Sequence, residues 1–219
     1  MKTIWKIAKT ELQSLFYSPI AWLVLVIFFI QCAVNFNNTF GSLVTNMELY
    51  GRANNATDAL FISQFTGMFP KLQSYLYLYL PLLTMGLMTR EYTSGSIKLL
   101  FSSPVTNRQI ILGKYLAMMV YSAVLVGCIA VFAFFGFATI DKVDTFRVLT
   151  GLLGFYLLTC TYSAIGLFMS CITTYQIIAA VCTLTVLFLL SQVRSFAQEI
   201  EFVRDLAFSC GVNLMSARR

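Results

Sequence analysis

The sequence predicts an all-α integral membrane protein, with an N-terminal interfacial amphipathic helix followed by five transmembrane helices. The first observation is composition: hydrophobic residues make up 58% of the 219 residues, charged residues only 11%, and mean hydropathy is +0.78. Soluble domains are about half apolar and about a quarter charged, so this chain has too few polar side chains to cover a water-facing surface. The second observation is that the charges leave four long charge-free gaps. These gaps are residues 12–47, 72–89, 115–140 and 148–193.

The charge-free gaps define the spans, because a helix needs about 20 apolar residues to cross a bilayer. The first three gaps each hold one span, and Asn35, Asn37 and Asn38 mark the end of the first. The fourth gap is long enough for two spans, with the polar run 170–174 as the turn between them. Pro81 lies inside the second span and predicts a kink. The predicted spans are Tyr17–Phe36, Leu72–Met88, Leu116–Thr139, Val148–Met169 and Tyr175–Leu190.

Residues 1–19 form a basic amphipathic segment ahead of the first span. Such a segment prefers to lie along the membrane interface, with its lysines toward anionic headgroups. The alternative is a solvated start to the first span. The apolar face at helical spacing comprises Trp5, Ala8, Leu12, Leu15 and Phe16. The residues predicted to contact the interface are Lys2, Trp5, Lys6, Lys9, Leu12 and Phe16.

The distribution of lysine and arginine predicts a cytoplasmic N-terminus, because cytoplasmic loops carry an excess of these residues. Two sets of basic residues face opposite sides of the membrane. The larger set is Lys2, Lys6, Lys9, Arg90, Lys98, Arg108 and Lys114. The smaller set is Arg52, Lys71, Lys142 and Arg147. The arginines near the C-terminus oppose this orientation, since all four fall outside after five spans. The net charge of +6 gives no reason to expect nucleic-acid binding, because the basic residues are spread over loops and tails.

The predicted spans contain no Asp, Glu, Lys, Arg or His. A charge inside a membrane costs about 2.5–3.5 kcal/mol on insertion scales and normally marks an ion or proton pathway. This absence disfavours a proton-coupled antiporter, a pump with its own carboxylate relay and a voltage sensor. A membrane enzyme is disfavoured too, because the chain has no histidine and no paired acid or metal-ligating groups. The Gly113-Lys114 pair lacks the rest of a phosphate-binding loop. A transporter of this kind therefore needs an external energy source.

Two patterns within the spans have both structural and functional readings. Tyr75, Tyr77 and Tyr79 could line a path or could simply pack and anchor at the interface. The pairs Ala123 with Gly127 and Gly166 with Ser170 have the small-residue spacing that can let membrane helices approach closely, although such spacings are common in membrane helices.

The connection 90–114, REYTSGSIKLLFSSPVTNRQIILGK, predicts a structured connector rather than a plain turn. Gly95 can end an extension of the second span, and Pro104 stops the short apolar stretch between them. Thr106 and Gln109 fit a capping box at the start of the third span. An apolar helix held outside the bilayer needs a partner to cover it. The residues leave two readings open: a soluble protein docks there, or the connector folds back onto the membrane surface.

This connection resembles the signature of the ABC-2 type permeases, the membrane subunits of type V ABC transporters. Among these, it is most similar to permeases of the gliding-motility-associated type. The resemblance covers essentially the whole chain, and the N-terminal segment resembles the family's interfacial connecting helix. The residues that carry the signature are Glu91, Gly95, Leu99, Leu100, Ser103, Pro104, Arg108, Gly113 and Lys114.

The resemblance implies that loop 90–114 is a coupling helix that docks on a separate ABC ATPase subunit, with Glu91 as the acidic coupling residue. ATP and Mg²⁺ would bind in that partner, and this chain would hold no cofactor. Two permease halves, identical or not, would form the path within a bacterial inner membrane. The residues implied in coupling are Glu91, Gly95, Lys98, Leu99, Leu100, Ser103, Pro104 and Arg108.

The family pattern has six spans, whereas this sequence predicts five. The expected organisation is an interfacial helix (1–19), a transmembrane domain (20–193) and an extracytoplasmic amphipathic segment (194–219) that ends before a sixth span. The resulting function hypothesis is a permease subunit of an ABC-type exporter with an unknown substrate. The alternative is a non-transporting membrane scaffold or assembly factor, which would bind its partners without ATP-dependent flux.

Overall fold

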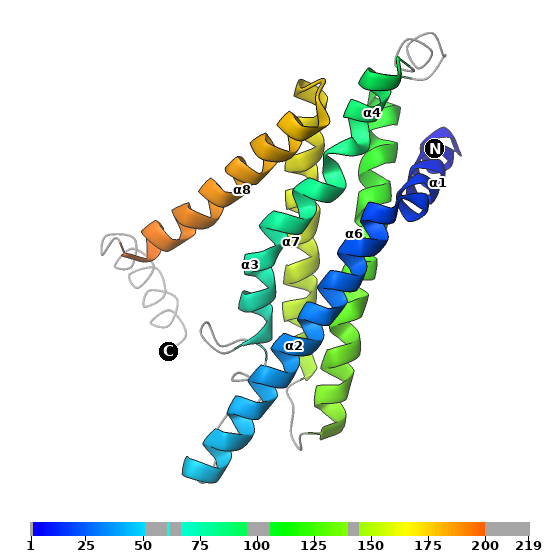
Figure 1. Cartoon of the computed structure of the whole chain (residues 1–219). Coiled ribbons are helices and arrows are strands. Elements are labelled where there is room, and N and C mark those ends of the chain that lie inside the picture. Colours follow the sequence, from blue (N-terminus) through cyan, green and yellow to red (C-terminus); the bar gives the residue numbers. More distant parts are fainter. Residues whose placement is uncertain (1, 51–60, 62–66, 96–105, 140–144, 200–219) are drawn as a thin grey trace, which may run out of the picture. The chain divides into compact units, whose positions relative to one another are not determined.

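The computed structural model describes residues 2–50, 61, 67–95, 106–139 and 145–199, and nearly all of them are helical. No β-strand occurs among these residues. The chain divides into two compact units, Met1–Thr183 and Leu184–Arg219, and the contacts discussed below lie within the first. In chain order the helices are α1 (Lys2–Tyr17), α2 (Pro19–Tyr50), α3 (Met68–Thr84), α4 (Gly86–Ser94), α6 (Asn107–Thr139), α7 (Thr145–Ile172) and α8 (Gln176–Glu199) (Figure 1).

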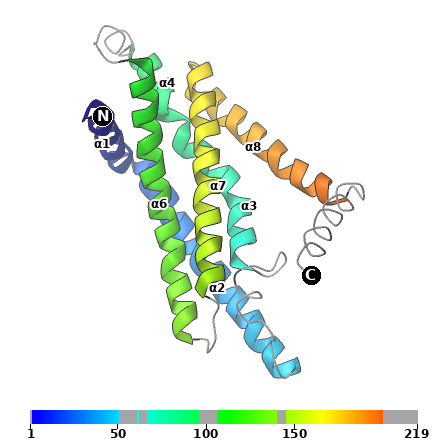
Figure 2. The ribbon, with the colours of Figure 1, turned by 180° about the vertical axis from the view of Figure 1, so that it is seen from behind.

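Within the described residues, three helices are long and apolar enough to cross a membrane, and they account for the predicted first, third and fourth spans. Figure 2 shows α6 and α7 side by side along the bundle. The predicted fifth span corresponds to a shorter apolar stretch of α8, Gln176–Gln192, and the predicted second span covers parts of α3 and α4. The prediction of an all-α integral membrane fold is confirmed. The spanning stretches are Pro19–Ser42, Asn107–Gly136 and Thr145–Ile172.

The predicted second span is divided into α3 and α4 at Met85, four residues after Pro81, which lies inside α3. Proline disturbs the turn that precedes it, and Met85 N–H still donates to Pro81 O (2.9 Å), so Pro81 does not account for the break. Met88 N–H donates to Ser170 Oγ on α7 (3.1 Å), and Ser170 Oγ donates to Met85 O (3.3 Å). One hydroxyl group on α7 therefore completes the backbone hydrogen bonding at the break.

Helices α3 and α7 approach closely because α7 presents glycines to α3. A Cβ placed on Gly166 would lie 2.7 Å from Thr84 Cβ, and one on Gly151 would lie 2.7 Å from Phe69 Cε2. At either position a larger residue would require the neighbouring side chain to shift. Gly166 and Ser170 both face the α3–α4 break, whereas a Cβ placed on Gly127 would meet no atom within 4 Å.

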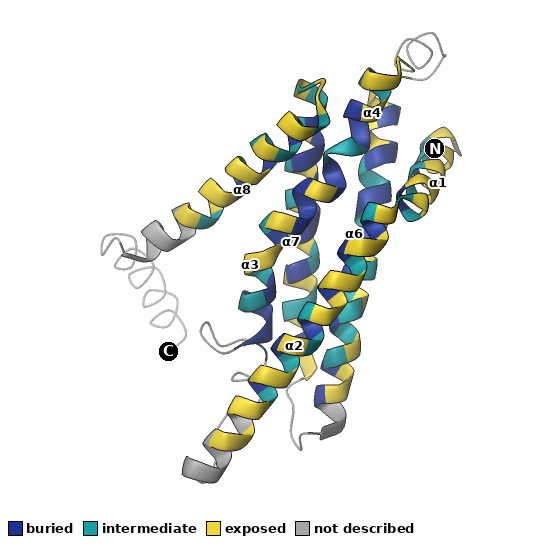
Figure 3. Ribbon diagram, viewed as in Figure 1, coloured by how far each residue is buried: buried dark blue, intermediate teal, exposed yellow. Residues whose placement is uncertain are grey.

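Two tyrosine hydroxyl groups inside the bundle donate to acceptors on a neighbouring helix. Tyr121 Oη donates to Ala21 O (2.8 Å), which ties α6 to α2. Tyr79 is buried, and its hydroxyl donates to Gln31 Oε1 on α2. Of the two roles open to Tyr79, the structure supports packing. Figure 3 shows that the buried faces of α3, α4, α6 and α7 turn toward one another, while large apolar side chains remain exposed on the outer faces, as expected where lipid is the solvent.

Several predicted helix ends are wrong, because charge-free length sets only the minimum extent of a helix. Asn35 does not end the first span; it is buried within α2, and its Nδ2 donates to Gln31 O. Ser170 and Cys171 lie in α7 instead of the predicted turn, which falls after Ile172. The segment expected to begin separately at Arg194 continues α8 as far as Glu199. Amide and hydroxyl groups that bond to the preceding turn let a helix continue through a polar stretch.

Some charged residues that the charge-free gaps placed outside the spans lie within helices in the structure. Lys71 is in α3, Lys114 is in α6 and Arg147 is in α7. The expectation that the spanning helices carry no charge is therefore wrong at Lys114, which lies within the spanning stretch of α6 and is buried.

Candidate functional site

Helix α1 packs against the start of α6, and this is the most extensive contact between the helices that the structure describes. Ala8 and Leu15 are buried on the inward face of α1. A Cβ placed on Gly113 would lie 2.7 Å from Ile7 Cγ2 and 3.3 Å from Ile4 O, so Gly113 lets the two backbones approach. The glycine of the Gly113-Lys114 pair therefore has a packing role.

The predicted apolar face of α1 divides into two parts. Ala8 and Leu15 face the bundle, whereas Trp5 keeps 66% of its surface exposed. The inward face also includes half-buried Ile4 and Ile7, which the sequence reasoning missed. An exposed tryptophan suits the boundary between headgroups and acyl chains, where its amphipathic ring is favoured.

The other predicted interface residues differ in exposure, and the ring of Phe16 packs against Tyr121 of α6. Lys6 and Lys9 are exposed, and Leu12 and Phe16 are half-buried, while the side chain of Lys2 lies outside the described residues. These positions leave the interfacial role of α1 a prediction. The C-terminal end of α1 is tied to α2, because Trp22 Nε1 donates to Phe16 O (2.8 Å).

The buried ammonium group of Lys114 joins three helices. Its Nζ lies 2.5 Å from Glu11 Oε1 on α1, 2.7 Å from Glu91 Oε1 on α4, and 2.7 Å from Leu87 O on α4. The contacts with Glu11 Oε1 and Leu87 O are hydrogen bonds that the ammonium group donates, and the contact with Glu91 Oε1 is an ion pair. The side chain of Lys114 is 2% exposed, whereas Glu11 and Glu91 are 22% and 20% exposed. We call Glu11, Glu91 and Lys114, with the Leu87 carbonyl, the Lys114 cluster.

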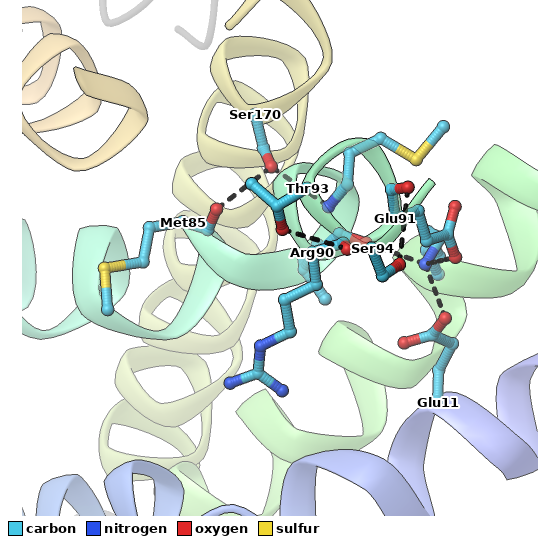
Figure 4. A network of polar contacts seen from close by, with 10 residues as sticks. Glu11, Met85, Arg90, Glu91, Thr93, Ser94 and Ser170 are labelled. Atoms are coloured by element: carbon cyan, nitrogen blue, oxygen red, sulfur yellow. Dashed lines mark hydrogen bonds and ion pairs between the residues drawn. The ribbon is translucent and has the colours of Figure 1, made fainter. Parts of the chain in front are cut away.

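Figure 4 shows Glu11 and Glu91 directed toward the same point, whereas the guanidinium group of Arg90 points elsewhere. A cavity of about 200 Å³ adjoins the cluster, and Glu91 Oε2 is buried without a hydrogen-bond partner among the described residues. Two carboxylates and one ammonium give this corner a net negative charge, which the exposed Arg90 beside it offsets. Three serines complete the polar part of the wall: Ser14 of α1, Ser18 between α1 and α2, and Ser94 of α4.

Both ends of the predicted coupling loop are well defined. Gly95 ends α4 with φ of 70°, a left-handed conformation that favours glycine, as predicted. Gln109 Oε1 accepts from Thr106 N–H (3.4 Å), so the half of the capping box that the glutamine supplies is present at the start of α6. Between these ends, Lys98, Leu99, Leu100, Ser103 and Pro104 lie outside the described residues.

The remaining predicted coupling residues occupy different surroundings. Arg108 is exposed on the first turn of α6, while Glu91 turns inward to Lys114. The structure thus brings Glu91 together with Gly113 and Lys114 of the signature, and adds Glu11, which the sequence reasoning did not select. The signal for Glu11 is its position: it shares the inward face of α1 with Ile4, Ala8 and Leu15, where an acidic residue needs a buried partner.

Residues 5–200 match the family described as ABC-2 family transporter protein. The chain belongs to this family. It is thus an integral membrane component of an ABC transporter, and not itself catalytic. Members of the family generally work with an ABC ATPase and as dimers. A comparison with curated proteins finds no match. Similarity to the gliding-motility-associated type stays a prediction.

Proposed function

We propose that this protein is the permease subunit of an ABC-type exporter, coupled to a separate ATPase through loop 90–114. A second permease half, identical or related, would complete the path. ATP and Mg²⁺ would bind in the ATPase subunit. The N-terminus and the loop would lie on the cytoplasmic side of a bacterial inner membrane, with lipid contacting the exposed side of α1.

The observation that carries the proposal is the anchoring of both ends of this loop to the same buried ammonium group. Residue 91 precedes the loop's apolar stretch on α4, and residue 114 follows it on α6, yet their side chains meet at 2.7 Å. A loop with flexible ends would absorb an applied force. A loop whose flanking helices are joined would transmit the force to both.

The same geometry changes the role proposed for Glu91. A carboxylate that holds Lys114 inside the fold is directed away from a docked protein, so contact with the ATPase would fall to the apolar residues of the loop. Leu99 and Leu100 are the apolar pair best suited to that contact. Desolvated apolar side chains commonly form the centre of such interfaces.

The test is association with an ABC ATPase of the same organism. A tagged chain, purified in mild detergent, should retain that ATPase, whereas Leu99→Asp should lose it because a charge is placed in an apolar interface. Val143→Asp is the matched control, since it introduces the same charge in the connection at the other end of α6.

Retention of the ATPase by Leu99→Asp at the wild-type level would contradict docking through this loop. Loss by both variants would indicate misfolding, and a milder Leu99→Ala variant would then decide. A complex that hydrolyses ATP without moving any permease helix would favour the scaffold alternative.

A further inference from the structure

We infer that the Lys114 cluster is the joint through which movement of loop 90–114 reaches α1, making Glu11 and Lys114 positioning residues for energy coupling. This inference rests on the proposed function, because it needs a loop that an ATPase moves. It adds a second output: the ATPase would move the interfacial helix as well as the spanning helices.

The first support is connectivity. Helix α4 ends at the loop and α6 begins after it, and Lys114 bonds to α4 through both Glu91 Oε1 and Leu87 O. Glu11, which is 103 residues away in sequence, brings α1 to the same ammonium group at 2.5 Å. A displacement of α4 relative to α6 therefore cannot leave α1 unaffected while these contacts persist.

The second support is the environment of the cluster. Lys114 is 2% exposed, so water and salt screen its ion pairs little. Removing one partner of such a pair leaves an uncompensated buried charge, which opposes separation of the helices. The contacts at Gly113 add steric fit between α1 and α6, but steric fit alone would allow α1 to slide.

The third support is what α1 presents on its other side. Trp5 is 66% exposed, and Lys6 and Lys9 are exposed beside it. In the predicted orientation these side chains contact the headgroup layer. A movement of α1 would therefore be passed to the membrane surface, with α1 acting as a lever. Hydrogen bonding of Trp22 to Phe16 O holds the far end of that lever to α2 and provides a pivot.

The variants must remove the joint without leaving a buried unpaired charge. The triple variant Glu11→Gln/Glu91→Gln/Lys114→Met replaces all three charges by neutral groups of similar shape, an exchange that proteins often tolerate. Lys114→Arg keeps the charge, and the adjoining cavity of about 200 Å³ gives space for the larger head group. Lys71→Met is the matched control, because it removes a lysine from α3 outside the cluster.

The experiment measures helix movement in the complex with its ATPase. Spin labels are placed on a cysteine-free chain at Lys9→Cys on α1 or Lys98→Cys in the loop, each paired with Ser42→Cys on α2. Labelled chain is diluted with unlabelled chain so that one labelled copy is present per complex. Pulsed electron–electron resonance then compares the distances with and without Mg-ATP and vanadate.

In the wild-type background, both distances should shift on addition of Mg-ATP and vanadate. In the neutral triple variant, the shift at position 98 should persist while the shift at position 9 is lost. The single variant Lys114→Arg should keep the shift at position 9. The control Lys71→Met should leave the shifts at positions 9 and 98 unchanged. A merely structural cluster would not produce this split, because misfolding would abolish both shifts together.

Two results would overturn the inference, and they are distinguishable. An unchanged shift at position 9 in the triple variant would show that α1 follows the bundle without the cluster, and would leave the proposed function intact. No shift at position 98 in the wild type would overturn the proposed function and this inference with it. If the triple variant did not assemble, the single variant Glu11→Gln would decide. A shift of wild-type size at position 9 in Glu11→Gln would reject the inference that the Lys114 cluster links the loop to α1.

Discussion

Two junctions hold α4 in place, and they use different chemistry. Toward α1 and α6, the contact is the Lys114 cluster, in which one ammonium group serves two carboxylates and a carbonyl. Toward α7, the contact uses no charge: Gly166 permits close approach to Thr84, and Ser170 bonds to the broken backbone at Met85 and Met88. The first junction is directional and electrostatic, whereas the second depends on small size and hydroxyl groups.

This difference indicates which junction is fitted to transmit movement. Small-residue packing fixes a distance between helices but leaves their relative sliding lightly opposed. A desolvated ion cluster fixes particular atoms to one another, so the helices that contribute them move together. The junction with charge lies beside both ends of the predicted coupling loop, whereas the junction without charge lies at the α3–α4 break.

The largest effect should come from Lys114→Met, which leaves Glu11 and Glu91 close together without a cation. Breaking a buried ion pair in this way costs about 3–5 kcal/mol. We expect a loss of that order in the free energy of unfolding, measured by SDS titration in mixed micelles. The neutral triple variant should recover most of the loss. Equal destabilisation in both would mean that packing of the lysine stem, and not its charge, stabilises the junction.

The next effect tests the junction with α7 by adding one methyl group. Gly166→Ala would place a Cβ 2.7 Å from Thr84 Cβ, so we expect a loss of about 1–3 kcal/mol by overpacking. Gly154→Ala on the same helix is the control, because a Cβ there meets no atom within 4 Å. The control should be neutral or stabilising by up to about 1 kcal/mol. Equal effects of the two substitutions would argue against close approach at Gly166.

A smaller effect should follow from Ser170→Ala, which removes the acceptor of Met88 N–H. We expect a loss of about 1 kcal/mol, near the value measured for hydrogen bonds within membrane proteins. Ser163 is also fully buried on α7, but its hydroxyl donates only to Thr159 O of the same helix. Ser163→Ala should therefore change stability by clearly less, and the reverse order would contradict the assignment of Ser170 to the helix break.

The smallest perturbation tests the outer face of α1 without altering either junction. With Trp22→Phe, Trp5 becomes the sole tryptophan and reports the depth of α1. In liposomes, its fluorescence should be quenched strongly by lipids brominated near the headgroup and weakly by those brominated near the acyl ends. Strong quenching by an aqueous quencher, with none by lipid, would show that α1 is solvated instead.

The sequence predicted those features that depend on local rules. Gly95 predicted the end of α4, and Thr106 with Gln109 predicted the start of α6. Charge-free length located the helices but not their ends, because Asn35 and Ser170 satisfy their polar groups inside helices.

The Lys114 cluster could not be predicted from the sequence, because it depends on tertiary contacts across the fold. Glu11 and Lys114 are 103 positions apart, and no periodicity links them. Glu11 and Lys114 each directly precede a charge-free gap in the sequence, so both looked like markers of the membrane boundary. Only the packing of α1 on Gly113 turns two boundary charges into a buried pair.

The most direct test of the central claim, that Lys114 joins α1 to α4 and α6, is a double-mutant cycle between Glu11→Gln and Lys114→Met. The free energy of unfolding is measured for the wild type, both single variants and the double variant. Interacting residues show coupling energies of about 0.5–3 kcal/mol, and we expect a value in the upper half of that range. Additivity within about 0.5 kcal/mol would contradict the claim, because it would mean that α1 and α6 are held together without this ion pair.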